Sequence, residues 1–187
     1  AKKNISRQQT NGQVFEVGLV FDTSAKDRGL VQKVKVAGAL WGRRQDENWC
    51  ETADKVDFFD VKGVVEALGS WAGLRMQTVI ATDDALHPGQ SAQLRLNGES
   101  IGRFGRLHPL IEKQLGMPEV FVFELDGTAI MSRPERRHQA ISKFPSVRRD
   151  LAVVVKRDVI ARDVIATVVN ALNENCMEVM LFDVYEG

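Results

Sequence analysis

The sequence predicts an α+β fold in which antiparallel strands dominate, followed by a single β-α-β unit. Three patterns carry this prediction. Apolar residues alternate with other residues over 14–21, as in a strand with one buried face. Over 58–72 they recur every three or four residues, as on one side of a helix. Asn97-Gly98 separates two further strand-like stretches and is typical of the tight turn of a β-hairpin.

The first predicted domain, residues 1–139, holds most of the strands. Asn11-Gly12 indicates a turn, so a strand over 5–9 is expected to pair with the strand over 14–21. In the latter strand, Phe15, Val17, Leu19 and Phe21 share one face, as a half-buried strand with one face toward the core requires. Similar patterns predict further strands at 31–41, 75–80, 91–97, 99–107 and 119–125.

Two helices are predicted among these strands. Asp57 precedes the periodic stretch 58–72, where its carboxylate could accept free backbone N–H groups of the first turn. Pro109 is suited to the first position of a second helix and Gly116 to its end. The apolar side of this second helix is expected to consist of Leu110, Ile111 and Leu115.

The second predicted domain, residues 140–187, begins after a stretch without periodicity at 126–145, which we interpret as a linker. It should contain a strand at 151–156, a helix at 160–172 and a strand at 178–184. The inner face of this helix is expected to be formed by Val164, Ile165, Val168 and Leu172.

Composition narrows the class of protein. Of the 187 residues, 44% are hydrophobic, which is sufficient for a genuine core. Two cysteines without metal-ligand spacing predict a reducing, cytoplasmic setting. No apolar run approaches the roughly 18 residues that a membrane helix needs, so no membrane partner is expected. The 25 basic and 25 acidic residues balance, but between Arg133 and Arg149 six basic residues accompany one acidic residue.

No complete catalytic set can be read from the sequence. His87, His108 and His138 lie outside zinc-ligand spacing, and the first two precede prolines at predicted turns, which favours structural roles. The GxSxG pattern of a nucleophile elbow does not occur. The glycine pair of Gly102 and Gly105 falls within a predicted strand, so it does not form a phosphate-binding loop.

An RNA contact is a stronger candidate. Lys143, Arg148 and Arg149 lead into the strand at 151–156, with Phe144 among them. Cations attract phosphates and an exposed aromatic ring can stack on a base, as at single-stranded RNA sites. Two plainer interpretations remain open, namely that the cluster is a solvated linker and that Phe144 fills the core at the domain junction.

Several motifs together resemble the bacterial phenylalanine–tRNA ligase β-subunit family. They occur in the family's order and cover nearly the whole chain. The motifs are VDFFDVKG (56–63), LHPGQSA (86–92), IGRFGRLHP (101–109), FPSVRRDLAVVV (144–155) and LFDVYEG (181–187).

The resemblance implies an α2β2 ligase that joins phenylalanine to its tRNA with ATP and magnesium. It implies that residues 1–139 form a class II synthetase-like domain that is non-catalytic and packs against the catalytic α subunit. Family enzymes with activity hold ATP with an arginine and a glutamate in their second motif. The strand at 14–21 carries Glu16 and no arginine, so no cofactor is expected on this chain itself.

The resemblance also implies that residues 140–187 begin a ferredoxin-like anticodon-binding domain, roughly the first half of a β-α-β-β-α-β fold. In that fold another strand lies between the first two, so the strands at 151–156 and 178–184 would not touch. On this basis the residues expected to contact tRNA(Phe) are Phe144, Arg148, Arg149 and Tyr185, with Lys143 secondary. Two alternatives are a stand-alone class II-like ligase or acyltransferase and a pure protein-interaction module.

Overall fold

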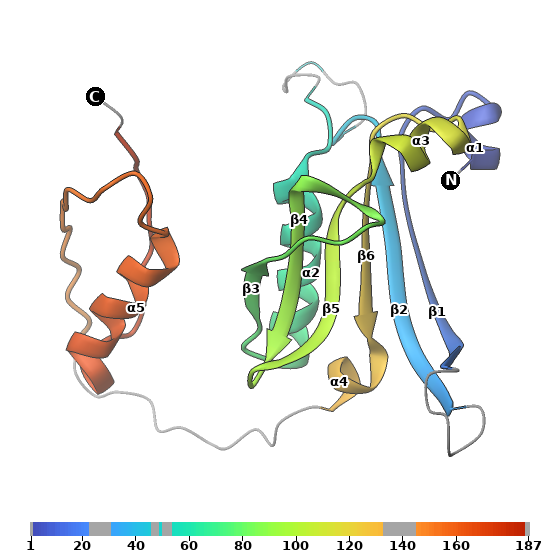
Figure 1. The fold of residues 1–187 in the computed structure, drawn as a ribbon. Coiled ribbons are helices and arrows are strands. Elements are labelled where there is room, and N and C mark those ends of the chain that lie inside the picture. Colours follow the sequence, from blue (N-terminus) through green and yellow to red (C-terminus); the bar gives the residue numbers. More distant parts are fainter. Residues whose placement is uncertain (1, 23–30, 46–48, 50–53, 133–144, 186–187) are drawn as a thin grey trace. The chain divides into compact units, whose positions relative to one another are not determined.

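A computed structural model describes residues 2–22, 31–45, 49, 54–132 and 145–185 (Figure 1). The chain divides into two compact units, Ala1–Arg137 and His138–Gly187. Within the described residues, the first unit holds a six-stranded sheet and the helices α1 to α4, and the second holds the helix α5 followed by a 3-10 turn at Asn173–Asn175, so the predicted α+β class is confirmed.

The sheet of the first unit is wholly antiparallel, and its strand order is β1-β2-β6-β5-β4-β3. The six strands predicted between residues 14 and 125 are all present in this sheet. Two of them have the predicted bounds, and the ends of the other four differ from the prediction by up to five residues. Their bounds are β1 Gly12–Asp22, β2 Val31–Trp41, β3 Gln77–Ile80, β4 Leu86–Leu96, β5 Glu99–Leu107 and β6 Val120–Asp126.

The predicted hairpin joins β4 to β5. Asn97 and Gly98 both adopt positive φ angles, of 52° and 87°. A two-residue turn of this kind requires positive φ at both positions, which asparagine tolerates and glycine adopts freely. The twist of such a turn matches the twist of the flanking strands, so the register of the hairpin is set locally.

Strand pairing gives the sheet two unlike faces. One continuous row across the strands is Val17, Val36, Leu125, Gly102 and Leu94, and the last four lie over or beside the hydrophobic core. Side chains alternate between faces along a strand, so the intervening residues point to the opposite face. That opposite face carries the row Glu16, Ala37, Glu124, Arg103 and Gln93.

Helix α2 (Phe58–Ala72) covers the apolar face at strands β4, β5 and β6 (Figure 1). Its bounds and its cap are those predicted. The Asp57 carboxylate accepts hydrogen bonds from the N–H groups of Phe59 (2.7 Å) and Asp60 (3.0 Å). Asp60 in turn accepts from the Asp57 N–H at 2.8 Å, which completes a capping box. Val61 and Val65 are fully buried against the sheet.

The apolar face extends beyond this helix onto β1, and here one expectation was wrong. Phe15, Val17, Leu19 and Phe21 do share a face, but they are 58–79% exposed and not half-buried. The alternation of a strand predicts which residues lie together. Whether another element covers them depends on where the helices pack, and α2 lies over other strands.

Two short helices correct further expectations. Residues 5–9 do not form a strand, because α1 (Lys2–Ser6) occupies this region and Gln8 leaves it at a φ of 65°. The start of the predicted linker at 126–145 instead contains α4 (Gly127–Met131), which is capped by Asp126. Helix α4 contacts β2 and buries Ile130 in the core.

Helix α3 (Pro109–Leu115) begins and ends where predicted. Of its predicted apolar side, Ile111 is partly buried, but the prediction is wrong for Leu110 and Leu115. Leu110 is 66% exposed and Leu115 is 39% exposed, whereas Glu112 is buried. A buried carboxylate can be stable when it is paired and hydrogen-bonded. Glu112 meets this condition through contacts with β5 and β6 that are invisible in the local sequence.

In the second unit, α5 (Ala161–Leu172) is present and Val164, Ile165 and Val168 are half-buried, as predicted, whereas Leu172 is exposed. The segments 151–156 and 178–184 are not strands, because within residues 145–185 they form no ladder with each other or with another segment. The two segments are expected to remain unpaired if a third strand must lie between them to form hydrogen bonds with both. Their apolar side chains are accordingly exposed, for example Val154, Phe182 and Val184.

Candidate functional site

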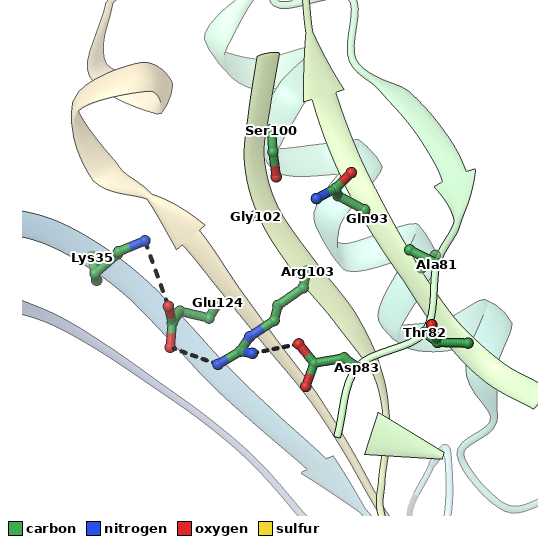
Figure 2. Close-up of a pocket in the computed structure, with 10 residues that line it drawn as sticks. Lys35, Ala81, Thr82, Asp83, Gln93, Ser100, Gly102, Arg103 and Glu124 are labelled. Carbon is green, nitrogen blue, oxygen red and sulfur yellow. Dashed lines mark hydrogen bonds and ion pairs between the residues drawn. The ribbon is translucent and has the colours of Figure 1, made fainter. Parts of the chain in front are cut away.

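The polar face of the sheet carries a chain of ion pairs that links three strands and the loop before β4 (Figure 2). Lys35 on β2 lies 3.5 Å from the carboxylate of Glu124 on β6. The guanidinium of Arg103 on β5 lies 4.0 Å from the other oxygen of Glu124. On its far side Arg103 donates a hydrogen bond to Asp83, which precedes β4. Cations and carboxylates therefore alternate across the sheet.

Local backbone structure holds Asp83 in this position. Its Oδ1 accepts a hydrogen bond from the backbone N–H of Ala85 at 2.9 Å, while Oδ2 faces Arg103. Partial burial by itself would raise the pKa of Asp83, but the Ala85 N–H and the Arg103 guanidinium together hold this pKa below its ordinary value. Asp83 is therefore ionised at neutral pH and neutralises Arg103.

These side chains surround an open hollow of about 300 Å³, which is also lined by Thr82, Gln93 and Ser100. Its surface can offer hydroxyl and amide hydrogen bonds to a ligand. Its two cations are already engaged by carboxylates, so a polyanion entering here would meet Asp83 and Glu124 as well as Arg103. Among the described residues, no three His, Cys, Asp or Glu side chains gather where they could hold a metal ion.

A second charged cluster ties helix α3 to the sheet. The guanidinium of Arg106 donates to both carboxylate oxygens of Glu112, at 3.3 and 2.9 Å, and also lies 2.7 Å from Glu119. The N–H of Val120 donates to Glu112 at 3.0 Å. The hydrogen bond to Glu112 is the main reason that the pKa of Arg106 is raised. Because every charge here has a protein partner, we interpret this cluster as structural.

The described histidines also have structural roles. Nδ1 of His108 accepts the N–H of Leu110 at 3.2 Å and so caps α3. Nδ1 of His87 accepts the N–H of Gly89 at 3.0 Å. Both roles agree with the prediction, while His138 lies outside the described residues.

The predicted RNA-contact residues lie in the second unit. Arg148, Arg149 and Tyr185 are exposed, Tyr185 by 91%. The Nε of Arg148 lies 3.4 Å from Asp150, with both side chains more than 60% exposed, so this pair is weak and open to solvent. Lys143 and Phe144 lie outside the described residues, and their role as RNA contacts stays a prediction.

Sequence reasoning missed the ion-pair chain on the sheet. Its members are separated by up to 89 positions, as from Lys35 to Glu124. A signal was present, since Lys35, Arg103 and Glu124 each occupy the non-apolar alternate positions of a predicted strand. The order of the strands in the sheet decides which of these charges lie next to one another. This order cannot be read from the periodicity of each strand, so the sequence did not predict the ion pairs.

Sequence comparison identifies the family. Residues 1–127 match the family model described as the phenylalanyl-tRNA synthetase beta chain CLM domain. The chain belongs to this family. Residues 142–187 match the model described as the ferredoxin-fold anticodon binding domain, so the two matched regions fall in the two units of this β-chain family member.

Individual relatives agree with this assignment. The chain is 44% identical over 189 residues to the phenylalanine–tRNA ligase beta subunit of Methylococcus capsulatus, which covers 100% of the chain and 24% of that protein. It is also 44% identical to the beta subunit of Pasteurella multocida, over 98% of the chain and 24% of that protein. This β-chain family member thus spans about a quarter of the length of these relatives.

A solved structure shares the fold. Pyrrolysyl-tRNA synthetase from Desulfitobacterium hafniense superposes with a TM-score of 0.51 and 7% identity, over 70% of this chain and 45% of that one. At this identity the similarity concerns the fold alone. In the described part of the chain, no helix combines the length and the apolar character required to cross a membrane.

Proposed function

We propose that this chain is a portion of the non-catalytic β subunit of a phenylalanine–tRNA ligase. In this role it packs against a catalytic α subunit in an α2β2 assembly and contributes to anticodon recognition during ATP-dependent aminoacylation of tRNA(Phe). The observation that supports the proposal most strongly is the match over the full length of the chain, at 44% identity, to a phenylalanine–tRNA ligase beta subunit.

The polar face of the sheet supports a non-catalytic role for this chain. ATP with magnesium carries clustered negative charge, and its stabilisation needs uncompensated cations or bound metal ions near the phosphates. Arg103 and Lys35 are instead paired with Asp83 and Glu124. The residues present do not fit a magnesium–triphosphate group, so we assign ATP and magnesium to the α subunit.

The second unit supports a role in RNA binding. Arg148 and Arg149 are exposed and can pair with phosphates, while Tyr185 presents an aromatic ring to solvent on which a base can stack. Lys143 and Phe144 would extend the same contact. The anticodon is single-stranded, so its bases are accessible to such a surface.

Replacement of both arginines in the intact α2β2 enzyme tests this role. Arg148→Ala combined with Arg149→Ala should weaken tRNA(Phe) binding and reduce the slope of log affinity against log salt by about 1.4, because two phosphate contacts to single-stranded RNA are lost. Filter binding across a salt series measures both quantities. Adenylate formation, followed by ATP–pyrophosphate exchange, should remain nearly unchanged.

Lys2→Ala combined with Lys3→Ala is the matched control, because it removes two exposed charges from the first unit. This variant should bind tRNA as the unaltered enzyme does. If the arginine variant lost adenylate formation while it retained tRNA binding, the proposed roles of the two arginines would be wrong.

A further inference from the structure

The hollow on the polar face of the sheet contains anions of its own. Among the described residues that line it, the charged ones are Lys35, Asp83, Arg103 and Glu124, two of each sign. Figure 2 shows that each cation lies beside a carboxylate. The net charge of the hollow is therefore zero, although its two cations alone would make it positive.

Glu124 lies between the two cations. Strands β2 and β5 flank β6 on its two sides, and each contributes one of them. The Oε1 of Glu124 is 3.5 Å from Nζ of Lys35, and its Oε2 is 4.0 Å from the guanidinium of Arg103. A carboxylate placed in this way occupies the position that the oxygens of an anionic ligand would take, because lysine and arginine pair with both in the same manner.

Asp83 lies on the other side of Arg103. Its Oδ2 accepts a hydrogen bond from the guanidinium, while its Oδ1 accepts the N–H of Ala85 at 2.9 Å. The side chain of Asp83 is 23% exposed, against 44% for Glu124. Of the two cations, Asp83 thus contacts Arg103, whereas Glu124 contacts both.

The rest of the lining is suited to an oxyanion. The hydroxyl groups of Thr82 and Ser100 and the amide of Gln93 can donate hydrogen bonds, and they line the same hollow of about 300 Å³. Neutral donors beside a lysine and an arginine are typical of sites that bind phosphate oxygens. The two carboxylates, and not a lack of cations or donors, therefore oppose the entry of an anion.

We propose that Asp83 and Glu124 are internal counter-ions that keep phosphate-type anions out of this hollow, and that Glu124 has the larger effect. The two residues determine what the polar face can bind, because they occupy the positive charges that a phosphate group would use. This inference goes beyond the proposed function and does not rest on it, since it concerns charges within this chain alone.

Isothermal titration calorimetry with pyrophosphate, in the absence of divalent metal ions, tests the proposal. Asp83→Asn combined with Glu124→Gln removes both negative charges and keeps the shapes of the side chains. This double variant should bind pyrophosphate at least about tenfold more tightly than the unaltered chain, because two cations a few ångströms apart are no longer neutralised. Its affinity should fall as salt is added.

Glu66→Gln combined with Glu119→Gln is the matched control. It changes the net charge of the chain by the same amount and also breaks two ion pairs, those of Glu66 with Lys62 at 3.2 Å and of Glu119 with Arg106 at 2.7 Å. Neither glutamate lines the hollow. The control should leave the affinity for pyrophosphate unchanged, so a general effect of net charge is separated from a local one.

Single substitutions test the roles of the two carboxylates. Glu124→Gln alone should give most of the gain in affinity, because Glu124 contacts both cations. Asp83→Asn alone should give less, because Glu124 remains between Lys35 and Arg103. Addition of Arg103→Gln to the double variant should abolish the gain, since one of the two cations is then absent.

Three results would overturn the proposal. They are an unaltered chain that binds pyrophosphate as tightly as the double variant, an equal gain from the control, and a folded double variant without any gain. Thermal unfolding followed by circular dichroism shows whether the double variant is folded. If it is not, Glu124→Gln alone provides the same test, because it keeps the pair of Asp83 with Arg103.

The outcomes also separate this inference from the proposed function. Tight binding of pyrophosphate by the unaltered chain would argue against both, since ATP was assigned to the α subunit. A double variant that is folded and gains no affinity would refute the role of the two carboxylates and leave the proposed function as it stands.

Discussion

Glu112 shows how a single residue can be placed against its usual preference. It lies on α3 with 5% exposure, a position at which an apolar residue would be expected. Its carboxylate is matched by the Arg106 guanidinium and by the backbone N–H of Val120. Through these hydrogen bonds, Glu112 connects α3 to β5 and to the start of β6.

Glu112→Ala should therefore lower the free energy of unfolding by on the order of 3 kcal/mol, because it leaves Arg106 partly unpaired and the Val120 N–H without its acceptor. Urea denaturation followed by circular dichroism measures the loss. Glu119→Ala is the control, since this carboxylate also contacts Arg106 but its side chain is 51% exposed, and it should cost less than about 1 kcal/mol. Equal losses from the two variants would contradict the role of Glu112.

At the scale of elements, α2 is the helix whose limits are most strongly encoded. Its capping box at Asp57 stands at the start, and Gly73 ends it in the left-handed conformation, at a φ of 74°. The same helix fills the apolar face over β4, β5 and β6. Local signals and packing agree here, which explains why its bounds could be predicted residue by residue.

Asp57→Ala should destabilise the first unit by about 1 kcal/mol, because two N–H groups of the first helical turn lose their acceptor. Asp57→Asn keeps an acceptor oxygen and should cost markedly less in the same thermal or urea unfolding experiment. Asp57 also lies 3.4 Å from Arg44. If asparagine were as damaging as alanine, the charge interaction with Arg44 and not the cap would be the main contribution.

For the whole molecule, the two units differ in how completely they bury their apolar residues. The first unit encloses Trp41, Phe104 and Leu125 at 1% exposure or less. In the second unit, no described residue is fully buried, and the segments on either side of α5 expose apolar side chains. A fold with so little burial has little to offset the entropy of ordering the chain.

We therefore expect the 187-residue chain to bind tRNA(Phe) weakly or not at all. With about three phosphate contacts, log affinity should fall by only ~2 per log unit of salt. Fluorescence anisotropy with labelled tRNA at several salt concentrations measures both the affinity and the slope. A tight complex with a steep salt dependence would show that the second unit is already competent to bind RNA.

The sequence alone determined the six strands of the sheet, the main helix and its N-terminal cap, because alternation, helical periodicity and turn residues act over a few neighbouring positions. It also identified the family, through motifs such as VDFFDVKG and FPSVRRD. Only the tertiary structure decided what covers each face. Strand order brought Lys35, Glu124 and Arg103 together, and the placement of the helices left Phe15 and Phe21 exposed. These outcomes depend on contacts between distant segments, which local patterns do not encode.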